Sequence, residues 1–219
     1  MAGATLASAL SQAPIYRDPS RSIDDRVSDL LGRMTLEEKF WQLFMIPGDL
    51  DDPANDYSLG IFGLQVSTAA KGDAPTARGH AERINAIQRY FVEHTRLGIP
   101  IIPFDEAVHG LAREGATMFP SAIALAATWD PALVRRVAGA IADEARTRGI
   151  RQVLSPVVNI ADDVRWGRVE ETYGEGNWLA GQCSSATTEG VRRRSIDART
   201  TCGFTSRCEA VRMTVARIC

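Results

Sequence analysis

Apolar and polar residues follow one another along this chain in the pattern of buried strands separated by amphipathic helices. Three short apolar runs predict strands at Gly60–Val66, Ile99–Phe104 and Val153–Ile160. Apolar residues recur every three or four positions in Thr76–Arg96 and again in Pro131–Arg148, which predicts a helix between each pair of strands. Strands that alternate with helices are typical of βαβ units around a parallel sheet, so the expected fold class is α/β.

Capping signals mark where several helices begin. Ser22 precedes one apolar stripe, and Thr35 with Glu38 forms a capping box ahead of the next. The second helix is expected to end at Pro47-Gly48, and a short helix is expected at Pro120–Ala127. The apolar stripes of the two early helices are expected to pack into the core: Val27, Leu30, Leu31, Met34, Leu36, Phe40, Leu43 and Phe44.

Neither the acidic loop nor the histidines predict a metal site. Residues 48–59 are rich in Asp but lack the EF-hand spacing, so a solvated loop is favoured over calcium binding. His80 and His94 fall on the polar face of a predicted helix and are expected to be solvated, whereas His109 follows a strand end, where it is placed to donate to the backbone or a ligand. Because metal, phosphate-loop and dinucleotide motifs are absent from the sequence, no metal or cofactor is expected.

Length and charge narrow the classes of protein to which this chain can belong. At 219 residues the chain is long enough for one domain but short for a complete (β/α)8 barrel. The net charge of −2 does not suggest a nucleic-acid partner, and no apolar run reaches the roughly 20 residues of a membrane span. Residues 1–15 lack the basic start of a signal peptide and are expected to be a disordered N-terminus.

Composition changes abruptly after Gly181. All four cysteines lie in residues 182–219, which carry seven Arg against three acids and lose the periodicity of helices and strands. The cysteine spacing is not that of a zinc site, and a basic nucleic-acid arm would also carry Lys and aromatic residues. We therefore expect residues 182–219 to be an unrelated, disordered tail, such as a reading-frame shift would produce.

The residues best suited to chemistry follow the second and third predicted strands, where ligands bind in α/β folds. Asn159–Glu175, after the third strand, combines five carboxylates with two arginines. Asp105 and Glu106 follow the second strand, and because side chains alternate along a strand, only one of them is expected to face a pocket. A carboxylate there is suited to accept sugar hydroxyls, or else caps a helix or pairs with an arginine.

Arg165 and Arg168 flank Trp166-Gly167 in the loop after the third strand. Each guanidinium offers a planar fork that binds carboxylates or hydroxyl groups. The alternative is a structural clamp between Arg168 and an acid of the same loop, namely Glu170, Glu171 or Glu175. A clamp that orients one functional carboxylate satisfies both interpretations.

Five short motifs resemble the N-terminal barrel domain of glycoside hydrolase family 3, the β-glucosidase and β-xylosidase group. They occur in the family's order and cover about residues 16–181, so together they make a strong resemblance although each alone is weak. The motifs are Arg33–Lys39, Gly98–Pro100, Glu106–Gly110, Phe119–Ser121, and Val164–Arg168 with Glu171, Tyr173, Gly174 and Glu175.

The resemblance implies a (β/α)8 barrel, periplasmic or secreted, that hydrolyses β-linked oligosaccharides or aryl glycosides from the non-reducing end with retention. This chain would hold about the first three βα units. The family positions that match Glu106 and Arg168 contact the sugar at the cleavage subsite, and Asp105, Arg165 and His109 complete the candidate substrate-binding set. Many members carry Asp where this chain has Glu106, and the Glu106–Gly110 motif resembles the xylosidase-like branch. As a hypothesis, the extra methylene of Glu106 occupies the space that a hexose C6 group needs.

The chain departs from the family where the chemistry itself is expected. The family's Lys-His pair after Gly174-Glu175 is missing, and so is the nucleophilic Asp of a Ser-Asp-Trp-like motif. We therefore expect a glycosidase fragment, truncated near Gly181, that is inactive as written. The alternative is a non-catalytic carbohydrate-binding fragment. A Schiff-base aldolase is disfavoured because neither Lys39 nor Lys71 lies at a predicted strand end.

Overall fold

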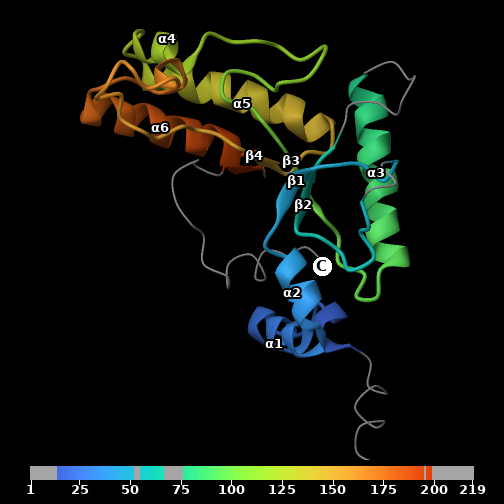
Figure 1. Cartoon of the computed structure of the whole chain (residues 1–219). Helices are drawn as coiled ribbons and strands as arrows, with labels where there is room; N and C mark the ends of the chain where they lie inside the picture. The colour runs from blue at the N-terminus through green and yellow to red at the C-terminus, as the bar shows by residue number, and fades with distance from the viewer. Residues whose placement is uncertain (1–13, 52–54, 67–75, 195, 199–219) are drawn as a thin grey trace, which may run out of the picture.

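The computed structural model describes residues 14–51, 55–66, 76–194 and 196–198, and Figure 1 shows their arrangement. Five short strands form one parallel sheet in chain order. Helices connect the strands from β2 onwards, which confirms the predicted α/β class. The strands are β1 (Met45–Pro47), β2 (Gly63–Gln65), β3 (Ile102–Asp105), β4 (Gln152–Val153) and β5 (Asp197–Ala198).

The predicted helix starts are confirmed by their caps. The Ser22 hydroxyl accepts from the Asp25 amide at 3.1 Å, and Thr35 and Glu38 exchange both hydrogen bonds of the capping box. Asp130 accepts from the Leu133 amide at 3.0 Å and so caps the helix that begins at the following proline. The helices are α1 (Ile23–Arg33), α2 (Leu36–Trp41), α3 (Ala77–His94), α4 (Ala122–Ala126), α5 (Pro131–Thr147) and α6 (Asn177–Arg192), with 3-10 turns η2 (Ile15–Arg17) and η3 (Val169–Glu171).

Two predicted boundaries are corrected by the strand pairing. The helix expected to reach Pro47 ends at Trp41, and Met45–Pro47 instead forms β1, which pairs in register with Gly63–Gln65. The strand expected at Val153–Ile160 is confined to Gln152–Val153. A proline lacks the amide hydrogen of a sheet ladder, so Pro156 disfavours a longer strand.

The main hydrophobic core lies between the sheet and helices α3 and α5 (Figure 1). Ile87 and Phe91 of α3 and Ala145 of α5 are fully buried in it, as the periodicity predicted. Burying a side chain as large as Phe91 contributes about 1.5–3 kcal/mol relative to leaving it exposed. Within the ranges described, no helix is both long and apolar enough to cross a bilayer.

The apolar stripe predicted for α2 is wrong in its orientation. Leu36, Phe40 and Leu43 are 78%, 53% and 49% exposed, whereas Glu38 and Gln42 are buried. Glu38 is buried because it serves both the capping box and an ion pair with Arg96, so a polar face of this short helix turns inward.

The chain after Gly181 continues the fold, so the predicted unrelated tail is corrected for this part. Helix α6 runs to Arg192 and packs along α5 (Figure 1), and β5 pairs with β4 beyond it. Its buried face consists mainly of small residues, which allow close helix packing without the large apolar side chains that mark a stripe: Ala180, Cys183, Ala186, Thr187, Gly190 and Val191. The predictions for residues 1–13 and 199–219, with three of the cysteines, lie outside the described residues; η2 already begins at Ile15.

Candidate functional site

Two strand-end loops meet on the C-terminal side of the sheet. Glu106 directly follows β3, and the loop after β4 places Arg168 and Glu171 at the two ends of η3. Each of these three side chains alters the pKa of another, so they lie within electrostatic reach. The structure thus brings together two of the residues predicted to contact a sugar, Glu106 and Arg168.

Glu106 presents a free carboxylate to this site. The residue is exposed, and its carboxylate makes no hydrogen bond or ion pair with the part of the chain that the structure describes. Partial desolvation, and then the negative charges of Asp105 and Glu171, raise the pKa of Glu106, while Arg168 opposes them. The carboxylate oxygens are therefore available to a ligand that donates hydrogen bonds.

Arg168 and Glu171 form a forked ion pair beside Glu106. Arg168 Nε donates to Oε1 of Glu171 at 3.0 Å, and Nη2 donates to Oε2 at 2.7 Å. The hydrogen bond from Arg168 lowers the pKa of Glu171, and the same bond raises the pKa of Arg168, so both groups remain charged near neutral pH. The sequence left two interpretations of Arg168, a ligand-binding residue or a clamp to an acid of the same loop. The structure contains the clamp, and the acid that Arg168 binds is Glu171.

Asp105 does not expose its carboxylate in this site, so the structure does not support its predicted sugar contact. The residue is 1% exposed, and its carboxylate accepts from Arg113 Nη2 at 3.0 Å and from Gln65 Nε2 at 2.8 Å. Of the two adjacent acids, Glu106 alone therefore faces outward, as strand alternation predicted. Arg113 and Gln65 were missed because no local pattern marks either residue as a partner of Asp105.

Arg165 and His109 differ in their relation to the site. The Arg165 guanidinium is highly exposed and engaged by Asp163, with Nε to Oδ1 at 2.9 Å, so it does not join the Glu106 group. His109 is half-buried, and its proximity lowers the pKa of Glu171, which places it at the edge of the site.

His80 is a buried residue, so the prediction of a solvated side chain is wrong. It is 1% exposed, and its Nε2 lies 3.1 Å from the Val66 carbonyl at the end of β2. Desolvation, and then the charge of Arg113, lower the pKa of His80, which keeps the imidazole neutral. His94 is exposed, as predicted. Among the described residues, no group of three or more His, Cys, Asp or Glu is arranged to hold a metal.

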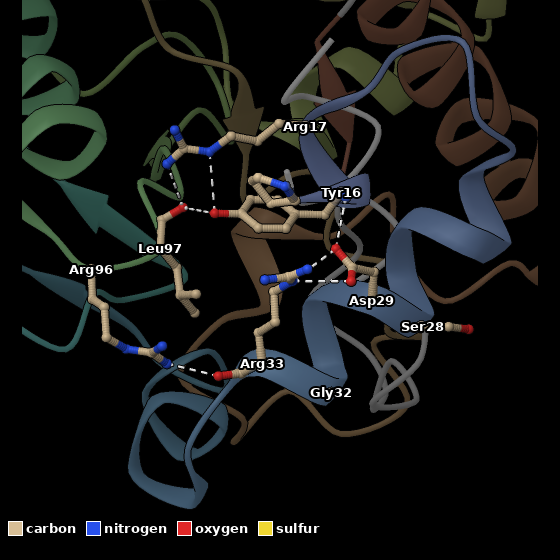
Figure 2. A pocket seen from close by; sticks show the side chains of 9 residues that line it. Tyr16, Arg17, Ser28, Asp29, Gly32, Arg33, Arg96 and Leu97 are labelled. Carbon is tan, nitrogen blue, oxygen red and sulfur yellow. Dashed lines mark hydrogen bonds and ion pairs between the residues drawn. The ribbon is translucent and has the colours of Figure 1, made fainter. Parts of the chain in front are cut away.

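A hollow in the described structure lies around Tyr16, Arg33 and Leu97 (Figure 2). It measures about 680 Å³ and is lined by η2, α1 and the segment around Leu97 that precedes β3. The Tyr16 hydroxyl donates to the Leu97 carbonyl at 2.7 Å, and the Tyr16 amide donates to Oδ2 of Asp29 at 3.0 Å. These bonds join η2 to α1 and to the start of β3, so we assign this hollow a structural role.

Known proteins resemble most of this chain. A family model described as the glycosyl hydrolase family 3 N terminal domain matches residues 35–204, which extends the resemblance past its predicted end near Gly181. A protein named probable beta-glucosidase C, from Aspergillus flavus, is 38% identical over 188 residues, which are 78% of this chain and 30% of that protein. A putative beta-xylosidase from Formosa agariphila is 30% identical over 195 residues, 83% of this chain and 25% of that protein.

The fold is shared with a solved structure. A β-glucosidase from Erythrobacter marinus matches with a TM-score of 0.74 at 34% identity, over 86% of this chain and 27% of that one. The predicted partial (β/α)8 barrel is thereby confirmed, and the chain spans less than a third of the length of each of these relatives. Because the family model covers more than three quarters of its residues, this chain belongs to glycosyl hydrolase family 3, within the N-terminal domain.

Proposed function

We propose that this chain supplies sugar-binding groups of a retaining β-glycosidase, with Glu106 accepting hydrogen bonds from hydroxyls of the bound sugar. The observation that carries the proposal is a free carboxylate next to the Arg168–Glu171 ion pair, at the strand ends where α/β enzymes bind ligands. An ionised carboxylate is acceptor-only and can receive more than one hydroxyl, which suits a polyol.

Each neighbour of Glu106 has a distinct part in this proposal. Glu171 occupies one edge of the Arg168 fork and thereby sets the orientation of the guanidinium. The positive charge of Arg168 opposes the rise in the pKa of Glu106 and so favours the ionised, accepting form. Arg168 has further N–H groups beyond those that Glu171 uses, and these are donors for a sugar oxygen.

The relatives' names support a β-glucoside or β-xyloside as substrate, either an oligosaccharide or an aryl glycoside. The longer side chain of Glu106 favours the xyloside, because a pentose lacks the C6 group that would compete for the same space. We therefore expect methyl β-D-xylopyranoside to bind more tightly than methyl β-D-glucopyranoside. Equal dissociation constants for the two sugars would remove this part of the proposal.

A polypeptide of these 219 residues is proposed to bind such sugars without hydrolysing them. Retention requires two carboxyl groups about 5 Å apart, one of which attacks the sugar. The acids nearest Glu106 are already engaged, Glu171 by Arg168 and Asp105 by Arg113, and the sequence contains no Ser-Asp-Trp-like motif. Release of the aryl group from aryl β-glycosides above the background rate would contradict this point.

Sugar binding is tested by titrating the ¹⁵N-labelled chain with each methyl glycoside. We expect shift changes at Glu106 and in the loop 165–175, and we expect Glu106→Gln to weaken them because a neutral amide replaces the accepting carboxylate. Glu170→Gln is the matched control, since Glu170 is an exposed acid of the same loop. If Glu106→Gln and Glu170→Gln titrate like the unaltered chain, Glu106 does not bind the sugar.

A further inference from the structure

The backbone of Glu106 is held on both sides of the residue. Its amide donates to Oδ1 of the preceding Asp105 at 2.9 Å, and its carbonyl accepts from the Ala112 amide at 3.0 Å. The side chain itself is free, so the polypeptide around Glu106 is fixed although the carboxylate has no partner in the described structure. Such an arrangement presents a ligand-binding group in one direction before the ligand arrives.

Asp105 is the centre of the contacts that fix this turn. Its buried carboxylate also accepts from the guanidinium of Arg113 and from Gln65 Nε2, and its own carbonyl accepts from the Leu154 amide at 3.0 Å. Since Gln65 belongs to β2 and Leu154 directly follows β4, one residue of β3 joins both neighbouring strands. Arg113 directly follows Ala112, so its fork closes the loop that begins at Glu106.

A buried ion pair such as Asp105–Arg113 is by itself weak evidence for a contribution to stability. Replacing a buried ion pair by apolar residues of similar volume is often neutral or stabilising, because both charges lose their hydration. The Asp105–Arg113 pair is buried at the carboxylate and lies directly under the turn that presents Glu106. The geometry points to Asp105 as a positioning residue that, with Arg113, sets the direction of the Glu106 carboxylate for sugar binding. This inference rests on the proposed function of Glu106.

The electrostatics of the turn agree with that role. Asp105 contributes to the raised pKa of Glu106, and the other charged groups that act on Glu106 are Glu171 and Arg168. Arg113 forms an ion pair with the Asp105 carboxylate and so partly offsets its negative charge. Removing the charge at position 105 should therefore lower the pKa of Glu106, whereas removing the charge of Asp163, which is not among the groups that act on Glu106, should leave this pKa unchanged.

The test compares Asp105→Asn with Asp163→Asn in the full chain. The control removes an equal charge from an exposed ion pair with Arg165, away from the Glu106 turn. In Asp105→Asn we expect amide exchange at Glu106 to accelerate, the Glu106 carboxyl to titrate at lower pH, and the dissociation constant of methyl β-D-xylopyranoside to rise. A loss of about tenfold in protection and in affinity corresponds to weakening one charge-assisted hydrogen bond. We expect no such change in the control.

The readouts separate failure of the inference from failure of the proposed function. If the unaltered chain binds neither methyl glycoside, the proposed function fails, and amide exchange and carboxyl titration still decide whether Asp105 holds Glu106. If Asp105→Asn folds and keeps the exchange rate and titration of Glu106, the inference is overturned. If Asp105→Asn does not fold, Arg113→Lys decides: it keeps the charge but loses the fork, and unchanged exchange at Glu106 overturns the inference.

Discussion

Replacing Gly190 by alanine is expected to force α6 away from α5. An added Cβ would lie 2.5 Å from the Arg135 carbonyl oxygen and 2.8 Å from the Ala138 Cβ, both on α5. Ordinary contacts begin near 3.4 Å, so the helices would have to separate by about 0.9 Å or distort locally. The substitution therefore tests whether residues beyond Gly181 are packed into the fold.

The size of the effect follows from two opposing terms. Overpacking a close contact costs about 1–3 kcal/mol, while alanine in place of glycine within a helix gains about 0.5–1 kcal/mol. The difference is a net loss of up to about 2.5 kcal/mol, which lowers the midpoint of thermal unfolding by up to roughly 10 °C for a chain of this length.

Gly181→Ala is the matched control on the same helix. An added Cβ at Gly181 has no atom within 4 Å, so only the helix-propensity gain applies and the midpoint should rise. Thermal and urea unfolding of both variants, followed by circular dichroism, measures the difference. If Gly190→Ala is as stable as Gly181→Ala, the close packing of α6 on α5 is wrong.

Three further predictions concern groups around the site. Burial raises the pKa of Tyr173 from 10.0 to about 12, so its contribution to stability is present below pH 10 and is lost as pH rises toward 12. Tyr173→Phe, which also removes the hydrogen bond to Thr187, should flatten this alkaline limb of the urea midpoint and cost about 1 kcal/mol at neutral pH. Gly110 has φ of 129°, and an added Cβ would lie 2.4 Å from a carbonyl oxygen of its own loop, so Gly110→Ala should lose at least 1 kcal/mol or so in urea unfolding. The pKa of buried His80 is lowered from 6.5, so stability should decrease as pH falls below 6.5; His80→Gln should remove this dependence and exposed His94→Gln should retain it.

The parts of the fold that could be predicted depend on residues close together in the sequence. The Thr35–Glu38 box and the Asp130 cap were recognisable because each joins atoms only three residues apart. The core face of α3 was recognisable because its apolar residues recur at helical spacing. The sequence order of strands and helices likewise predicted the parallel sheet.

The parts that could not be predicted depend on pairing between distant segments. His80 is buried because the end of β2 brings the Val66 carbonyl to its ring, and Asp105 is buried because β2 brings Gln65 to its carboxylate. Hydrophobic periodicity also failed for α6, whose buried face relies on small residues such as Gly190. At the candidate site, proximity of Glu106 and Arg168 was predictable from strand ends, but the Asp105 contacts were not.

Protection from hydrogen–deuterium exchange on adding a methyl β-glycoside tests the central claim most directly. The account predicts slower exchange at two separate segments, the turn at residues 105–112 and the loop at residues 165–175, and Glu106→Gln should weaken both effects. Protection confined to the hollow around Tyr16, Arg33 and Leu97 (Figure 2), or no protection anywhere, would contradict it.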